Sequence, residues 1–312
     1  MLNVKLGNSV LDPAIMNASG ALCTTREELF SLGQSRSGAI VIKSMTLEPR
    51  AGNAKPRYHP TPLGSVNSMG LPNLGYKEYA RLIPELKKFN KPVIASVAGL
   101  QPADYPVIAE TISRAGADLL EINLSCPNII GKPQIAYDFD CSRDVLDKTV
   151  KVIGGTPYGI KLPPYFDIAH FNAMAEVLKQ FKPAYISCIN SVPGGLVIDY
   201  EKEEIVIKPK YGGLGGDYVK PVTLGNIKRF HELLNAKIPI VGCGGVKNGT
   251  DVFEHLLAGA TAVQVGTQLM KEGPAVFERL ESELRQVLER KNYQHARDAV
   301  GKAKEPAERD SY

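Results

Sequence analysis

The chain has 312 residues, 44% of them hydrophobic, which is enough to bury a large core. Its 37 lysines and arginines nearly balance 33 aspartates and glutamates, and the net charge of +4 is scattered rather than gathered into a stripe that would neutralise the phosphates of a nucleic acid. The longest apolar runs, such as residues 39–42, fall far short of the roughly 20 residues that cross a bilayer. Nucleic-acid binding and membrane insertion are therefore not expected.

The cysteines and histidines argue against a disulfide framework and against a metal site. The five cysteines are odd in number, widely spaced and free of any C-x-x-C pair, and the five histidines show no metal-ligand spacing. The first residues contain neither an apolar segment nor a cleavage site of the kind found in secretion signals. We therefore expect free thiols, no metal ion and a cytoplasmic protein.

Short apolar segments alternate with longer segments of helical periodicity about eight times along the chain. The predicted strands are Ala14–Asn17, Ala39–Ser44, Pro92–Val97, Leu119–Leu124, Tyr158–Leu162, Tyr185–Asn190, Pro239–Gly242 and Ala262–Val265. The predicted helices are Arg26–Leu32, Tyr76–Lys88, Asp104–Ala115, Arg143–Ile153, Asp167–Phe181, Thr223–Leu234, Gly249–Ala258 and Pro274–Arg290.

Nearly continuous apolar strands indicate a parallel sheet, because both faces of such a sheet are covered by helices. Closed on itself, the sheet is a (β/α)8 TIM barrel. An open doubly wound sheet is the alternative, but it usually has fewer units and a G-x-G-x-x-G turn after its first strand, which this chain lacks. We predict one α/β barrel domain over residues 1–312, with a polar tail over 291–312 that forms a solvated end or a loose helix.

Two long segments interrupt the alternation of strands and helices. Thr46–Gly75 and Ser191–Pro221 are rich in Gly, Pro and Asn, which is typical of loops inserted at an active site. The second contains the apolar runs Val197–Asp199 and Ile205–Lys208, which predict an additional hairpin.

Glycine-rich turns follow the last two predicted strands. Gly242–Gly245 and Gly266–Thr267 each lead into a helix, and glycine lets backbone N–H groups approach an anion closely. The loops after strands seven and eight of a (β/α)8 barrel commonly hold a phosphate. Tight strand-to-helix turns would look the same, but the two loops together favour a phosphate site.

Lys43 and Lys161 stand at the ends of apolar strands, where burial of a lysine without a counter-charge is costly. A lysine there can contact the edge of a flavin ring on which negative charge accumulates during reduction. With one phosphate site and no paired carboxylates, flavin mononucleotide (FMN) fits better than a phosphorylated substrate.

Cys126 follows the fourth predicted strand directly, so its thiol is expected at the catalytic mouth. The segment after it, residues 129–134, has the composition of a lid. Most free cysteines are small buried hydrophobic residues, which is our interpretation of Cys23, Cys141 and Cys188. Side-chain amides that suit a polar planar ligand, or that simply form turns, occur at Asn67, Asn123, Asn128 and Asn190.

Six segments together resemble dihydroorotate dehydrogenase, in order, over residues 1 to about 290. They are Asn17–Gly20, Ile42–Ser44, Asn67–Asn73, Asn123–Asn128, Gly212–Gly216 and Gly242–Gly245. The sequences N-S-M-G-L-P-N and S-C-P-N resemble the class 1A, fumarate-linked branch, whereas the membrane-bound class has a serine as base and an N-terminal helical extension.

The resemblance implies an FMN enzyme of pyrimidine biosynthesis that oxidises (S)-dihydroorotate to orotate and reduces fumarate to succinate. Cys126 would be the general base, and Lys43 would face the substrate carboxylate. The substrate would be held by Lys43, Asn67, Met69, Gly70, Leu71, Asn123, Asn128, Asn190 and Ser191. FMN would be held by Ala18, Ser19, Gly20, Lys43, Ser44, Asn123, Lys161, Ile189, Gly215, Gly216, Cys243, Gly244, Gly245, Gly266 and Thr267.

The resemblance also suggests which branch of the family the chain belongs to and how the chain assembles. The class 1A branch is typically homodimeric, and the insertion at residues 191–221 is the expected interface. The alternative is the NAD-linked class 1B branch, which works with an iron–sulfur and FAD subunit and tends to have Gln where Pro72 stands. A barrel that binds flavin without catalysis is a second alternative.

Overall fold

The computed structural model describes residues 1–125 and 134–306 and contains one sheet of eight parallel strands. In sheet order, the strands are β3 (Ile15–Asn17), β16 (Ala262–Val265), β15 (Ile240–Cys243), β10 (Tyr185–Cys188), β9 (Tyr158–Leu162), β8 (Leu119–Asn123), β7 (Val93–Val97) and β4 (Ile40–Met45). All eight predicted strands are present. The predicted strand Tyr185–Asn190 ends two residues early, at Cys188.

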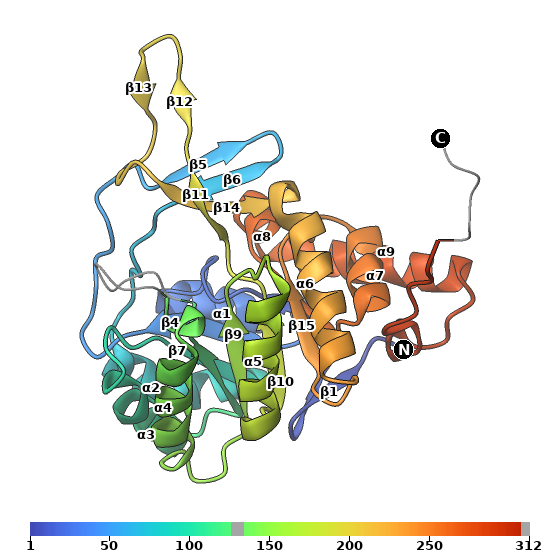
Figure 1. Cartoon of the computed structure of the whole chain (residues 1–312), viewed down its shortest axis with the longest axis horizontal. Helices are drawn as coiled ribbons and strands as arrows, with labels where there is room; N and C mark the ends of the chain where they lie inside the picture. Colours follow the sequence, from blue (N-terminus) through green and yellow to red (C-terminus); the bar gives the residue numbers. More distant parts are fainter. Residues whose placement is uncertain (126–133, 307–312) are drawn as a thin grey trace.

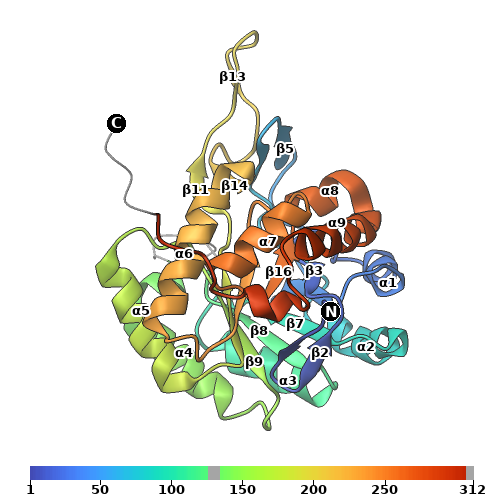
Figure 2. The same cartoon turned by 90° about the vertical axis from the view of Figure 1, so that its right-hand side faces the viewer.

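Helices connect successive strands and cover the outside of the sheet (Figures 1 and 2). They are α1 (Arg26–Gln34), α2 (Tyr76–Leu86), α3 (Asp104–Arg114), α4 (Phe139–Val150), α5 (Ile168–Phe181), α6 (Lys220–Leu233), α7 (Gly249–Ala258) and α9 (Val276–Arg290). The alternation confirms the predicted (β/α)8 barrel. A short helix that was not predicted, α8 (Thr267–Glu272), follows β16. Among the described helices, none has the length and apolar character needed to cross a membrane.

Side-chain caps decide where several helices begin. The Thr25 hydroxyl and the Glu28 carboxylate form a capping box at the start of α1, and Asn248 and Asp251 form another at the start of α7. The prediction that a helix begins at Arg143 was wrong by four residues. The Asp138 carboxylate accepts a hydrogen bond from the Cys141 amide at 2.9 Å and starts α4 one turn earlier.

The barrel closes between β3 and β4, the two ends of the hydrogen-bonded strand order. The fully buried Asn17 side chain bridges them: its Nδ2 donates to the Val41 carbonyl at 2.7 Å, and its Oδ1 accepts from the Val41 amide at 2.9 Å. A side-chain amide offers one donor group and one acceptor group and so replaces a backbone peptide here. Gly38 and Ile15 add a backbone hydrogen bond of 2.8 Å.

An N-terminal hairpin, which was not predicted, lies beside the amino ends of the barrel strands (Figure 2). It consists of β1 (Val4–Leu6) and β2 (Ser9–Leu11), paired antiparallel. Its buried side chains form one apolar cluster with inward-facing residues of the barrel, and we call this cluster the floor. The floor contains Val4, Leu6, Leu11, Ala14, Met16, Ala39, Val41, Ile94, Leu119, Tyr185, Val241 and Ala262.

The two insertions form a four-stranded antiparallel sheet over the carboxyl ends of the barrel strands, which we call the arm (Figure 1). Its strands are β11 (Val192–Gly195), β14 (Gly212–Gly216), β6 (Gly64–Asn67) and β5 (Tyr58–Thr61). The predicted hairpin is confirmed but shorter than expected, with β12 (Ile198–Asp199) and β13 (Glu204–Ile205) projecting from the arm. The strands β5 and β6 were missed within a segment rich in Gly and Pro.

The prediction for the C-terminal tail was wrong in part. Ala296 and Ala299 are fully buried in a short 3₁₀ helix, and the Ala296 amide donates to the Met1 carbonyl at 2.9 Å. Further on, the Gly301 and Ala303 amides donate to carbonyls at the end of α7. Small alanines and backbone hydrogen bonds hold this segment without the wide apolar stripe that the sequence prediction required.

The closure predicts the effect of Asn17→Ala. This substitution leaves the buried Val41 amide and carbonyl without partners, so we expect the free energy of unfolding to fall by roughly 2–4 kcal/mol. Denaturant unfolding measures this change. The control Asn3→Ala, at an exposed position, should stay within about 0.5 kcal/mol of the original protein. Equal stability of the two variants would contradict the role of Asn17 in closing the barrel.

Candidate active site

A cavity of about 510 Å³ lies between the carboxyl ends of the barrel strands and the arm. This volume is within the range of about 300–1,000 Å³ that holds small ligands and cofactors. Every predicted site residue that the structure describes lines it, and these residues are Ala18, Ser19, Gly20, Lys43, Ser44, Asn67, Met69, Gly70, Leu71, Asn123, Lys161, Ile189, Asn190, Ser191, Gly215, Gly216, Cys243, Gly244, Gly245, Gly266 and Thr267. Cys126 and Asn128 lie outside the described residues.

The Ser44 hydroxyl joins three strands and one loop at the bottom of the cavity. It lies 3.0 Å from the Ser19 Oγ and 2.8 Å from the Ser96 Oγ, and it accepts from the Asn123 Nδ2 at 3.1 Å. Because Ser19 donates its own proton to the Ile42 carbonyl, Ser44 donates to Ser19 and accepts from Ser96. Every hydroxyl proton in this chain thus has an acceptor, which fixes the positions of the side chains.

Asn123, Ser125 and Asn190 form a hydrogen-bonded rim at the edge of the cavity. The Asn123 Oδ1 accepts from the Ser125 amide at 3.1 Å and from the Ser125 hydroxyl at 2.7 Å. The Asn190 Nδ2 donates to the Ser125 carbonyl and hydroxyl at 3.1 and 2.9 Å. The last described residue before the gap is therefore fixed at the edge of the cavity.

Lys43 and Lys161 are both buried at the wall of the cavity. The Lys43 Nζ lies beside Gly20, since a Cβ built on that glycine would come within 3.7 Å of it. Burial acts to lower the pKa of Lys161, but Cys243 and Glu121 act to raise it, and the net shift is upward. Burial also raises the pKa of Cys243, which lines the same wall.

Three glycine-containing segments form a cradle of backbone at one end of the cavity. They are residues 215–216, 243–245 and 266–267, from the arm, the end of β15 and the end of β16. Gly244 has a φ of +133°, and a Cβ there would overlap the Thr223 hydroxyl. A Cβ on Gly215 would come within 2.9 Å of the Thr267 Oγ1. Glycine leaves room here for backbone N–H groups to approach a phosphate.

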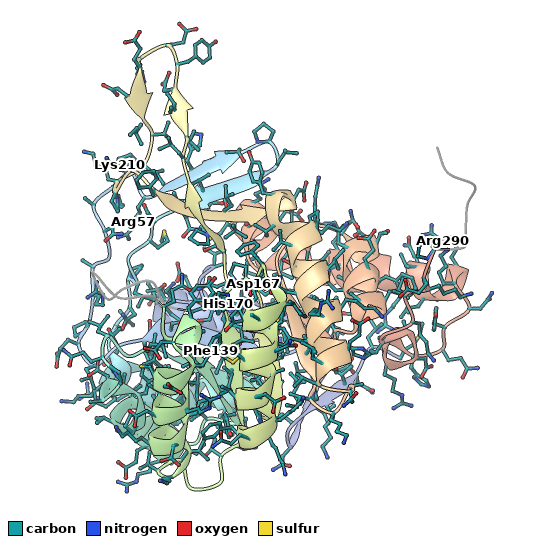
Figure 3. All side chains as sticks on the ribbon, viewed as in Figure 1. Arg57, Phe139, Asp167, His170, Lys210 and Arg290 are labelled. Carbon is teal, nitrogen blue, oxygen red and sulfur yellow. The ribbon has the colours of Figure 1, made fainter. Side chains whose placement is uncertain are left out.

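The arm completes the opposite wall of the cavity. The Asn67 Nδ2 donates to the Gly213 carbonyl at 3.3 Å, which links β6 to β14, and the Ser65 Oγ lies 3.2 Å from the Thr267 Oγ1. Figure 3 shows Arg57 and Lys210 at the base of the arm, opposite the ends of α4 and α5. Because the arm combines strands from both insertions and contacts the barrel at Thr267, it positions Asn67 over the strand ends.

Sequence analysis missed several residues of this cavity. Gln264 lines it from inside β16, and Ser125, which belongs to the segment Asn123–Asn128 but was not among the predicted site residues, lines it as well. A glutamine within the otherwise apolar strand A-V-Q-V was a visible signal for the first, and the serine beside the candidate base was a signal for the second. Tyr58, Leu63 and Ser65 belong to the arm strands that were not predicted, or to the turn between them.

The described cysteines are free thiols with distinct surroundings. Cys23 and Cys188 are fully buried, as expected, and burial raises the pKa of Cys23 to about 11. The expectation of burial was wrong for Cys141, which is partly exposed in the first turn of α4. Cys243 lines the cavity, but burial raises its pKa. Burial raises the pKa of Cys23, Cys188 and Cys243, so none of these three has the lowered pKa of a reactive thiol.

The residues present fit FMN. The glycine cradle suits its phosphate, and the cavity extends from there to two buried lysines and to the amides of Asn123 and Asn190. Lysine and amide groups are the donors that a flavin ring edge requires. A (β/α)8 barrel with this site defines a class of proteins that bind a phosphorylated cofactor at the carboxyl ends of their strands.

Comparison with known proteins identifies the family. The model of the family "Dihydroorotate dehydrogenase" matches residues 1–288, and the chain belongs to this family. Dihydroorotate dehydrogenase A (fumarate) of Lactococcus lactis subsp. cremoris is 46% identical over 310 residues, which cover 97% of this chain and 99% of that protein. Dihydroorotate dehydrogenase (fumarate) of Kluyveromyces lactis is 47% identical over 307 residues, covering 96% and 97%.

The fold also has a close match among solved structures. The crystal structure of DHODH from Eimeria tenella in complex with ferulenol superimposes with a TM-score of 0.82 at 19% sequence identity. The superposition covers 96% of this chain and 88% of the Eimeria tenella chain. At this identity the similarity shows the barrel fold.

The cradle predicts the effect of Gly244→Ala. The added methyl group meets the Thr223 hydroxyl and strains the backbone, so we expect the affinity for FMN to fall at least tenfold, which corresponds to about 1.4 kcal/mol. Titration of the flavin-free protein with FMN, followed by quenching of flavin fluorescence, measures the affinity.

The control is Gly225→Ala on the nearby helix α6, where an added Cβ has nothing within 4 Å. It should bind FMN as tightly as the original protein. Equal affinities for the two variants would remove Gly244 from the cradle.

Proposed function

We infer that this chain oxidises (S)-dihydroorotate to orotate in pyrimidine synthesis, with FMN as cofactor and fumarate as electron acceptor. This is the activity of the class 1A branch, and it follows from the family match and from relatives named for fumarate along nearly the whole chain. Within the structure, the strongest support for this function is the cavity, because each described residue that the sequence assigns to substrate or FMN lines it. The NAD-linked class 1B alternative is disfavoured by the same relatives.

FMN, when bound, would supply the hydride acceptor. For the remaining chemistry we propose Cys126 as the general base that removes the proton next to the ring carbonyl. Support comes from its neighbour in the sequence, since Ser125 is fixed by hydrogen bonds to Asn123 and Asn190 at the edge of the cavity. A thiol serves as a base when donors or charges bring its pKa near the working pH.

For substrate binding we propose that Lys43 faces the carboxylate. A buried ammonium at the cavity wall supplies the positive charge that an anionic substrate needs on leaving water. Asn67 from the arm and Asn190 from the barrel lie on different walls and offer the donor and acceptor groups that a cyclic amide requires. We propose that Asn123, Asn128, Ser191 and the segment Met69–Leu71 complete the substrate site.

We further propose that the chain is a single FMN-binding domain and works as a cytoplasmic homodimer, which sedimentation equilibrium at twice the monomer mass would support. The projecting hairpin exposes Ile198, Tyr200 and Ile205, with 80% of the Tyr200 surface accessible. Exposed apolar and aromatic side chains on an insertion suit an interface with a second copy. The free thiols suit a reducing compartment.

The choice of acceptor is tested with the purified chain alone. We expect its flavin to be bleached by dihydroorotate and restored by fumarate, with steady turnover in the absence of any second protein. Absorbance of oxidised flavin and of orotate follows the two half-reactions. Turnover with NAD that depends on an added iron–sulfur and FAD subunit would instead support the class 1B alternative.

The role of Cys126 predicts the effect of Cys126→Ala. We expect FMN to stay bound and reduction of the flavin by dihydroorotate to slow by about 10²–10⁴-fold, as for loss of a general base. Stopped-flow absorbance measures this rate. The control Cys141→Ala, on α4 and not among the described residues that line the cavity, should keep the original rate. An unchanged rate in Cys126→Ala would remove this thiol from the mechanism.

A further inference from the structure

A layer of buried polar side chains lies inside the barrel between the floor and the cavity. Glu121 on β8, Lys161 on β9 and Gln264 on β16 all point inward, and none is more than 4% exposed. The Gln264 Nε2 donates to the Glu121 Oε2 at 2.7 Å, and the Lys161 Nζ donates to the Gln264 Oε1 at 3.3 Å. The three side chains therefore form a continuous chain from Glu121 to the cavity wall.

The chemistry of the two ends fixes the orientation of the amide between them. A carboxylate only accepts hydrogen bonds and an ammonium only donates them, so Gln264 must turn its NH₂ to Glu121 and its oxygen to Lys161. The Ser187 hydroxyl donates to the same Gln264 oxygen at 3.3 Å. Without an acceptor at position 121, the Gln264 NH₂ would lose its described partner, and only the Lys161 and Ser187 donors would hold the amide.

Glu121 is not explained by the substrate or the cofactor. It is fully buried and is not among the described residues that line the cavity, whereas Lys161 and Gln264 are. Its Oε2 receives a second, longer hydrogen bond from the Tyr185 hydroxyl at 3.4 Å, and its Oε1 has no described donor. A buried carboxylate oxygen without a donor costs stability. Its presence therefore calls for a role beyond packing.

We propose that Glu121 is a positioning residue, whose carboxylate acts through the Gln264 amide to hold the Lys161 ammonium against the flavin. The inference rests on the flavin site proposed above. An ammonium at the ring edge stabilises the negative charge that a flavin gains on reduction. Glu121 thus favours flavin reduction indirectly, although its own negative charge would oppose it. The two effects have opposite signs, so a measurement can separate them.

The experiment measures the reduction potential of bound FMN in Glu121→Leu, which removes both the charge and the acceptor. We expect the equilibrium constant for two-electron reduction to fall about tenfold, a shift of roughly 30 mV to lower potential. Glu121→Gln, which keeps the size and one acceptor oxygen, should shift less in the same direction. If the leucine variant loses its flavin or does not fold, the sign of the shift in Glu121→Gln decides.

A double-mutant cycle with Lys161→Met tests whether the effect passes through Lys161. That variant should itself lower the potential, and adding Glu121→Leu to it should lower the potential no further. The matched control is Tyr185→Phe, which removes the other hydrogen bond to Glu121, on the side of the floor. It should keep the equilibrium constant within threefold, or about 15 mV, of the original protein.

Two results would overturn the proposal. A raised potential in the Glu121 variants that retain Lys161 would mean that the carboxylate acts chiefly through its own field. An unchanged potential accompanied only by a lower melting temperature would mean that Glu121 has a structural role. Failure of the original protein to bind FMN would overturn the proposed function as well, whereas normal flavin binding with an unshifted Glu121→Leu overturns this inference alone.

Discussion

The burial of two lysines at the carboxyl end of a closed barrel is the constraint on which the site depends. A buried ammonium is stable only where acceptors and an opposite charge surround it, and an inward-facing position on one strand can receive these groups only from neighbouring strands. For Lys161 the groups come from β8, β10 and β16, through Glu121, Ser187 and Gln264. Closure of the sheet by Asn17 brings β3 and β4 together and so completes the ring in which these groups meet.

The barrel interior divides into layers with different tasks. The floor is apolar and contains the N-terminal hairpin, so it contributes stability through burial. The next layer is polar and includes Ser44, Asn123 and Gln264, and its members satisfy one another almost completely. The cavity then opens between this layer and the arm. Because each layer supports the next, the side chains that face the ligand are fixed before a ligand arrives.

The sequence predicted the barrel well because periodicity and strand-ending residues are local signals. Each of the eight strands was found, and glycine, asparagine and lysine at their ends marked the cavity correctly. The elements that the sequence did not predict depend on partners that are distant in the chain. The arm strand β6, with which β5 pairs, is stabilised by β14, about 150 residues away, and the buried tail is held by Met1 and by α7. Glu121 gave no local signal, and Asn17 was marked only as the end of a strand, because the partners of both side chains lie on other strands.

The Glu121 Oε1, which has no hydrogen-bond donor among the described residues, connects stability with function. An apolar side chain of similar size in this layer would remove a buried charge, and such replacements are often neutral or stabilising. The chain nevertheless places a carboxylate there, beneath a lysine whose pKa is raised overall despite its burial. If the layer served only to hold the barrel together, hydrocarbon would serve better. The arrangement is therefore most economically explained by a requirement for charge at the cavity wall, with the apolar floor providing the stability that this polar layer does not.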